Sequence, residues 1–187
     1  MRLAFTTIAV LKHPYGHPDI LSYEERIGPV FGDAENSPGF IDRARPIDPD
    51  ETKTNFEWNY GPWGTFTTPR FYTGGRLAET DSRASTLSIW TDLASVRAFS
   101  RSEGHRYMLR NQARWVVHTE WKNVAAWWIG DEEIPTWEEA ARRIELLNDK
   151  GPSFEAFDFH TSYDEFGNLA SAPKAARSST YEGASAE

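Results

Sequence analysis

The sequence contains no cysteine. Disulfide bonds, thiolate nucleophiles and cysteine-ligated metal sites are therefore excluded, and the redox environment of the protein is left open. Glycine-rich phosphate loops, nucleophile elbows and closed sets of metal ligands are also absent, so no motif identifies a nucleotide cofactor or a hydrolase. We expect no cofactor and no bound metal.

Basic side chains are few. The chain has 20 lysines and arginines against 28 acidic residues, for a formal net charge of -8. This balance, without any basic run, argues against binding to nucleic acid or to an anionic membrane. No apolar run is long enough for a membrane span or a signal peptide, which leads us to expect a cytoplasmic protein. The expected partner is a neutral, apolar or aromatic small molecule.

Aromatic residues, in contrast, are abundant. Eight Trp, seven Tyr and eleven Phe make up 14% of the 187 residues, so the fold must bury these rings or use them in binding. Many of them fall within residues 48–82, among Gly, Pro and Thr, where neither a strand period nor a helix period is visible. We interpret this stretch as an aromatic insertion that covers a pocket as a lid or crosses to a partner subunit.

Hydrophobic periodicity predicts strands alternating with helices. Strands are expected over residues 2–11, 40–47, 83–90 and 123–130, and helices over 20–34, 93–100, 107–117 and 137–148. Asp19, Asp92 and Thr136 are expected to cap helices, and Pro29 to distort or split the first of them. Phe154, Phe157 and Phe159 are expected to form a final packed edge. Residues 1–162 then form one domain, and residues 163–187 form a disordered tail because their composition offers few apolar groups.

The order of these elements is typical of one architecture. We expect an α+β fold of the ferredoxin-like type, with an antiparallel sheet and helices on one face. The expected order that indicates it is strand, helix, strand, long loop, strand, helix pair, strand and helix. The other face of such a sheet must be covered, and a second copy of the chain is the usual solution. We therefore expect a homodimer.

Short motifs occur in a characteristic order along the chain. They are Leu3-Ala4, Ser37-Pro38-Gly39-Phe40, Leu87-Ser88-Ile89-Trp90, Val96-Arg97-Ala98-Phe99, His105 with Met108-Leu109, Arg114-Trp115, Trp127-Trp128, Pro135-Thr136, Ala140, Gly151-Pro152 and Ala156-Phe157-Asp158-Phe159. Through them, residues 1 to about 160 resemble a family of unassigned function in the dimeric α+β barrel superfamily, which also contains the antibiotic-biosynthesis monooxygenases. Monooxygenases of that superfamily tend to carry His where this chain has Phe99 and Asn near Thr7. Both departures argue against a direct transfer of their activity.

The candidate catalytic residue is His105, which lies within the matching block. An imidazole accepts and returns a proton near neutral pH, as a cyclisation, dehydration or isomerisation requires. Tyr60 and Tyr107 are the candidate hydrogen-bond donors. The alternative is that His105 only packs between, or caps, the two helical segments around it.

Aromatic side chains are the candidate substrate-binding residues. The set comprises Phe40, Trp58, Trp63, Trp90, Trp115 and Trp128, with His118 as a polar member. These rings would stack against a planar or polyene substrate and exclude water; aromatic residues at strand and helix spacing also serve as plain core.

Metal and haem sites find little support in the spacing. His13 and His17 are four residues apart, but prolines between and beside them disfavour the helix that such a pair needs. His118 with Glu120 and Asp158 with His160 are pairs without further ligands. A haem held by His105 or His118 would rest on one ligand-type residue.

The sequence thus predicts a cofactor-independent enzyme of secondary metabolism, a cyclase, dehydratase or isomerase that acts by acid–base chemistry on an apolar or aromatic substrate. Two alternatives stay open. One is a cofactor-free monooxygenase, and the other is a non-catalytic protein that binds a hydrophobic ligand.

Overall fold

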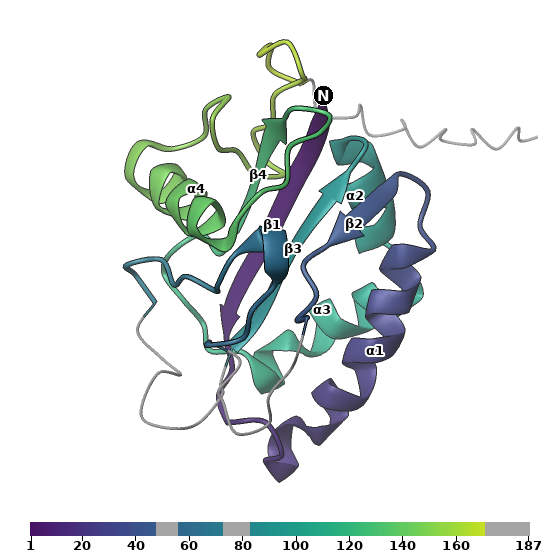
Figure 1. Ribbon diagram of the computed structural model, residues 1–187. Helices are drawn as coiled ribbons and strands as arrows, with labels where there is room; N and C mark the ends of the chain where they lie inside the picture. The colour runs from purple at the N-terminus through teal and green to yellow at the C-terminus, as the bar shows by residue number, and fades with distance from the viewer. Residues whose placement is uncertain (48–55, 73–82, 171–187) are drawn as a thin grey trace, which may run out of the picture.

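A four-stranded antiparallel sheet organises the chain (Figure 1). The computed structural model describes residues 1–47, 56–72 and 83–170. Its strands are β1 (Arg2–Val10), β2 (Phe40–Arg43), β3 (Arg83–Trp90) and β4 (Val124–Ile129), in the spatial order β2-β3-β1-β4. All neighbouring strands pair antiparallel. With helices in the connections, this is the predicted ferredoxin-like α+β fold, which is confirmed.

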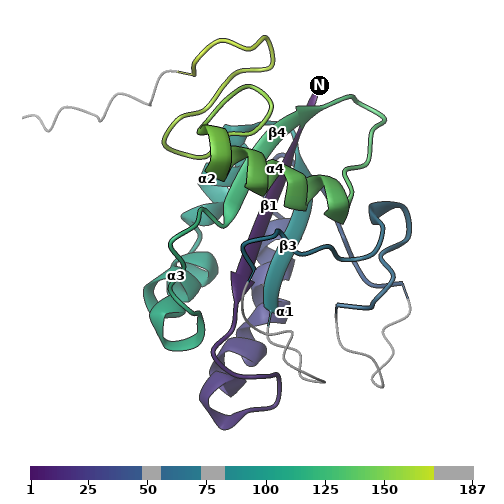
Figure 2. The same cartoon turned by 90° about the vertical axis from the view of Figure 1, so that its left-hand side faces the viewer.

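Three helices cover one face of the sheet (Figures 1 and 2). They are α1 (Leu21–Glu35), which follows the short 3-10 helix η1 (Pro18–Ile20), and the pair α2 (Leu93–Ser100) and α3 (Glu103–Trp115), which follows β3. Leu3 and Trp90 of the sheet pack with Val96 of α2 in one buried cluster. None of the helices in the described part of the chain is long and apolar enough to cross a bilayer.

The helix ends follow local capping rules with one exception. Asp92 accepts a hydrogen bond from the backbone N–H of Ser95 at 2.8 Å, and Thr136 accepts one from Glu139 at 3.2 Å, so these predicted caps are confirmed. Asp19 does not cap α1, because it lies inside η1 and the residue before the first turn of α1 is Ile20, whose side chain makes no capping hydrogen bond. Of the two effects expected at Pro29, distortion or a split, the split does not occur, since α1 runs on through it.

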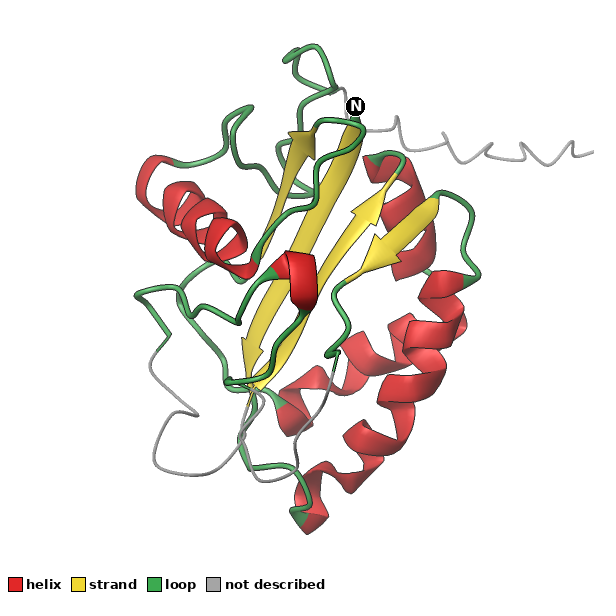
Figure 3. Cartoon of the chain, viewed as in Figure 1, coloured by secondary structure: helices red, strands yellow, loops and turns green. Residues whose placement is uncertain are grey.

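The same chain covers much of the opposite face of the sheet. The fourth helix, α4 (Trp137–Lys150), and residues 56–72, which include the 3-10 helix η2 (Gly61–Trp63), pack there (Figures 2 and 3). The buried side chains of this cluster include Ala4, Ile8, Leu87, Ile89 and Trp127 of the sheet with Phe56, Trp63, Phe66, Trp137 and Ile144. The described part of the aromatic insertion is therefore core, and a second copy is not needed to bury these residues. Residues 48–55 and 73–82 of the insertion lie outside the described residues.

The chain beyond α4 adds a packed edge to β4. Phe157 and Ala126 exchange two backbone hydrogen bonds of 2.8 and 2.9 Å, so Phe157 forms the expected packed edge, with Phe159 partly buried beside it, whereas Phe154 is exposed and does not belong to it. Residues 163–170 of the expected tail are described and fold back, since the N–H of Ala170 donates to Ser162 and the carbonyl of Tyr163 accepts from the Trp128 indole. Residues 171–187, for which disorder was expected, lie outside the described residues.

A truncation in α4 tests whether this helix closes the second face of the sheet. Ile144 is fully buried against it. Ile144→Ala should lower the free energy of unfolding by about 2–5 kcal/mol, because it removes buried methyl groups and leaves a void. Urea denaturation measures this change. Arg142→Ala, on the exposed side of the same helix, is the matched control and should stay close to wild type; equal effects of the two substitutions would contradict the packing described here.

Candidate functional site

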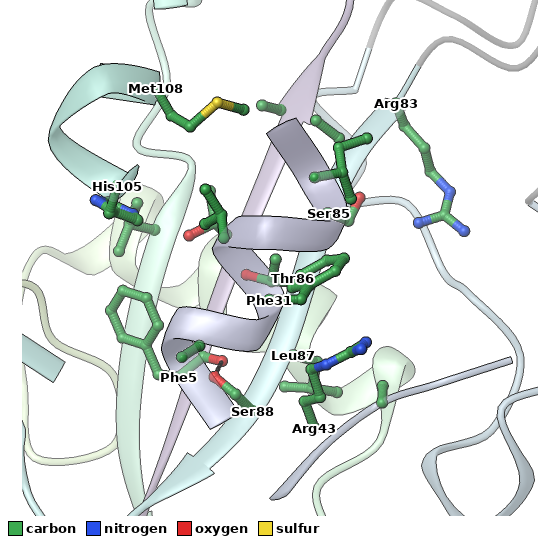
Figure 4. A pocket seen from close by; sticks show the side chains of 18 of the residues that line it. Phe5, Phe31, Arg43, Arg83, Ser85, Thr86, Leu87, Ser88, His105 and Met108 are labelled. Atoms are coloured by element: carbon green, nitrogen blue, oxygen red, sulfur yellow. Dashed lines mark hydrogen bonds between the residues drawn. The ribbon is translucent and has the colours of Figure 1, made fainter. Parts of the chain in front are cut away.

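A cavity of about 1420 Å³ lies between the sheet and the helices α1 and α3 (Figure 4). Its floor is formed by alternate residues of β1 and β3, namely Phe5, Thr7 and Ala9 paired with Ser88, Thr86 and Ala84. All but Phe5 have small side chains. Because the side chains on this part of the sheet are short, they do not fill the space between the sheet and the helices α1 and α3.

The helices supply a larger, more apolar roof. Lining residues from α1 include Ile27, Val30 and Phe31, and those from α3 include His105, Met108 and Gln112. His105 and Met108 stand on one side of the cavity in Figure 4, while Arg43 and Arg83 stand on the other. The cavity is thus a mainly apolar chamber with a few polar groups, as small-molecule sites usually are.

The cavity continues past the edge of β3. β2 pairs with β3 only from Ser88 to Trp90, so the start of β3 has no strand partner on that side among the described residues. Residues from the second face also line the cavity, among them Ser85, Leu87, Tyr60 and Trp137. The hydroxyl of Ser85 and the indole N–H of Trp137 are buried and have no hydrogen-bond partner among the described residues.

Arg83 joins this second region to the aromatic segment. Its side chain is buried, its Nη2 donates to the Tyr60 hydroxyl at 2.8 Å, and its guanidinium lies 3.7 Å from the centre of the Phe66 ring. Cation–π attraction of this kind is strongest when the cation is shielded from water. The cation therefore fixes the position of Tyr60 in the cavity wall.

His105 is held in one orientation at the start of α3. Its backbone N–H donates to the cap residue Ser102, its ring Nδ1 lies 3.2 Å from the carbonyl oxygen of Ser100, and its ring meets Phe99 edge-on at 4.9 Å. Burial lowers the pKa of His105 below 6.5, opposed by the hydrogen bond to Ser100. Burial therefore favours the neutral form of the ring. A proton on Nδ1 satisfies the Ser100 carbonyl and leaves the lone pair of Nε2 as an acceptor.

The structure brings most of the predicted site residues to the cavity. His105, Tyr60, Phe40, Trp58, Trp90 and Trp115 line it. Four other predicted residues lie outside the cavity wall. Trp63 belongs to the core of the second face, and the Trp128 indole donates to the carbonyl of Tyr163. Tyr107 packs with Arg26 and Trp115, and His118 is exposed. The assigned roles stay predictions.

Sequence reasoning missed the polar floor of the cavity. Thr7 and Thr86 stand opposite each other on neighbouring strands and both line it, and Ser85, Arg83 and Gln112 line it as well. A signal was present in the strand alternation, since one face of β1 and β3 reads small or polar while the other reads apolar. It is a weak signal, because a solvent-facing side of a sheet has the same pattern.

These features define an α+β protein of ferredoxin-like topology with a large cavity between sheet and helices. The chain belongs to the family described as "Domain of unknown function (DUF3291)", which matches residues 2–172. Among curated proteins, none matches significantly. A solved structure to which the chain is similar is SnoaB, a cofactor-independent oxygenase from Streptomyces nogalater, with 9% sequence identity, a TM-score of 0.40, and coverage of 72% of this chain and 97% of that one.

Filling the cavity should leave the fold intact. Ala84→Leu places a larger side chain on the floor, where there is room, so we expect stability to be retained and fluorescence of a bound hydrophobic dye to fall. Ala125→Leu is the matched control on the packed face of the sheet, where Ala125 is fully buried. Overpacking there should cost about 1–3 kcal/mol in urea unfolding. If both substitutions destabilise equally, the floor of the cavity is not open.

The lowered pKa of His105 predicts a pH dependence of stability. The folded state binds this proton less tightly than the unfolded state, whose imidazole titrates near 6.5. The contribution is therefore complete above pH 6.5 and is lost as the pH falls through the lower folded pKa. Urea midpoints should fall between pH 7.5 and 5.5 more steeply in wild type than in His105→Gln. Parallel profiles for the two proteins would contradict the burial of this ring.

Proposed function

We propose that this chain is a cofactor-independent enzyme of secondary metabolism that acts on an apolar or aromatic small molecule by acid–base chemistry. The observation that carries the proposal is the cavity, which combines apolar walls with one neutral, oriented imidazole. Its volume of about 1420 Å³ exceeds the roughly 300–1,000 Å³ of ordinary small-molecule pockets, so it suits a polycyclic or polyene substrate.

His105 is the proposed acid–base residue. With Nδ1 donating to Ser100, Nε2 is free to accept a proton from a substrate carbon next to a carbonyl group, which forms an enolate and an imidazolium. Return of the proton to another carbon completes an isomerisation. Attack of the enolate carbon on a carbonyl of the same molecule forms the ring and an alkoxide, and transfer of the imidazolium proton to this alkoxide completes a cyclisation. Transfer of that proton to a β-hydroxyl group, which leaves as water while the enolate becomes an unsaturated ketone, completes a dehydration.

Donors in the second region of the cavity are the proposed partners of the substrate oxygen. The Ser85 hydroxyl and the Trp137 indole N–H are buried there without a partner among the described residues, which favours donation to a ligand over an empty apolar wall. The Tyr60 oxygen accepts from Arg83, so its own proton is left to donate. Tyr107 is not part of this proposal, because it does not line the cavity.

The two polar regions lie on different sides of the chamber. His105 belongs to α3, whereas Arg83 opens β3 across the cavity from it (Figure 4). We infer that the substrate is elongated, with an apolar body between two functional groups. The homodimer and the cytoplasmic location stay predictions, and a dimer would use a surface other than the one that α4 and residues 56–72 cover.

Solvent hydrogen exchange tests the acid–base step without knowledge of the natural substrate. Wild-type protein incubated in D₂O with a panel of polycyclic aromatic and polyene ketones should catalyse deuterium incorporation next to a carbonyl group, detected by mass spectrometry. His105→Gln should abolish the incorporation while it still binds the same ketone, since Gln cannot take up the proton. The matched control is His118→Gln, an exposed position away from the cavity, which should exchange like wild type.

The same assay separates the alternatives when it is run without oxygen. Exchange that persists anaerobically supports the proposal. Consumption of oxygen with an oxygenated product, lost under anaerobic conditions, would replace it with a cofactor-free monooxygenase. Tight binding of a ketone that is recovered unchanged and unlabelled would replace it with a hydrophobic-ligand-binding protein.

A further inference from the structure

The loop between β1 and η1 brings together three potential metal ligands. His13 Nε2 lies 3.5 Å from Asp19 Oδ2, and His17 Nδ1 lies 3.8 Å from the same oxygen. The two imidazole rings are stacked, with centres 4.0 Å apart and planes 8° from parallel. One ligand atom from each residue lies within 4.8 Å of the others, and this triad is the single such group of His, Cys, Asp and Glu among the described residues.

A turn, not a helix, makes this arrangement. The prolines at 14 and 18 exclude a helix across the pair, as the spacing indicated, but Gly16 has a φ of +83° and reverses the chain between the two histidines. Its N–H donates to the carboxylate of Glu24 on α1. The histidines therefore meet across a tight loop that the first turn of α1 holds in place.

We propose that His13, His17 and Asp19 form a binding site for one divalent transition-metal ion, with Zn²⁺ as the best match. Zn²⁺ binds imidazole nitrogen and carboxylate oxygen at about 2.0–2.2 Å, which in a tetrahedron places neighbouring ligand atoms roughly 3.3–3.6 Å apart. The His13–Asp19 separation falls in this range and the His17–Asp19 separation is close to it. Three protein ligands leave the fourth position to water.

The site needs only side-chain adjustment. His17 Nδ1 accepts the backbone N–H of Asp19 at 3.2 Å, so an ion at Nδ1 displaces that bond, and the two stacked rings must turn out of parallel for both ring lone pairs to point at one ion. The side chains of His13 and His17 are more than a third exposed and that of Asp19 about two thirds, so these rotations are open and little water must be removed from the ligands.

A metal at this position would restrain one wall of the cavity. Tyr15, between the two histidines, lines the cavity, and its hydroxyl donates to the backbone carbonyl of Arg83 at 3.2 Å. The ion would therefore tie the loop that carries Tyr15 to the start of α1. The inference stands on the loop geometry alone and does not rest on the proposed function.

Calorimetric titration of Zn²⁺ into the untagged, chelator-treated full-length protein tests the site. We expect one ion per chain in wild type, and loss of that binding in His13→Ala and in Asp19→Ala, whose side chains are exposed enough for both variants to fold. His118→Ala and His160→Ala remove exposed histidines elsewhere and are the matched controls, which should bind like wild type. His17→Ala is less informative, because it also removes the acceptor for the Asp19 N–H.

Nitrogen NMR of the imidazoles gives a readout that does not depend on any variant. Zn²⁺ added to wild-type protein should shift the side-chain signals of His13 and His17 and leave those of His105, His118 and His160 in place. The proposal is overturned if wild type takes up no Zn²⁺, if both His13→Ala and Asp19→Ala retain full binding, or if the shifted signals belong to the other histidines.

Discussion

The difference in side-chain size between the two faces of β1 and β3 is the constraint on which the rest of this structure depends. On one face, Ala4, Ile8 and Ile89 lie in a buried cluster with α4 and the aromatic segment. On the other face, small residues such as Ala9 and Thr86 lie opposite helices α1 and α3, whose larger side chains keep the helix backbones away from the sheet. The same two strands therefore build a core on one side and a cavity on the other.

The packed face explains why the chain can carry such a cavity. Hydrophobic burial is the main favourable contribution to folding, and an open chamber of this size forgoes much of it on the helix side. Trp63, Phe66 and Trp137 restore burial on the opposite side, where α4 and residues 56–72 pack on the sheet. The aromatic richness of the chain is thus partly a structural compensation, and only some of its rings reach the cavity.

His105 combines structural contacts with a place in the cavity wall. Its backbone completes the cap of α3 and its Nδ1 satisfies a carbonyl at the end of α2, which are the structural roles that the sequence left open. The contacts with Ser100 and Phe99 prevent the ring from turning, and its burial favours the neutral form, which are the properties that the proposed general base needs. The structural role and the proposed catalytic role of His105 are therefore compatible, and a measurement of proton transfer tests the catalytic one.

Local rules carried much of the fold and part of the candidate site. Among the described residues, strand alternation and helical spacing located each strand and main helix, although β2 ends at Arg43 and not at residue 47. Capping chemistry located the starts of α2 and α4, because these signals act over a few neighbouring residues. They failed at Asp19, which lies inside the 3-10 helix η1 rather than at a cap, and over residues 107–117, because α3 begins at Glu103 and ends at Trp115. Both failures fall where neighbouring elements, not local propensity, decide the end of a helix.

What the sequence by itself determined is the kind and order of the elements, and hence the ferredoxin-like topology, since periodicity is encoded in each segment separately. Which residues share a space was decided only in three dimensions. Alternation alone does not tell whether Thr7 and Thr86 face water or a chamber, and spacing alone does not show that a glycine turn stacks His13 on His17. The tertiary structure settled these points because each depends on how parts of the chain are placed relative to one another, which the sequence pattern of a single segment does not specify.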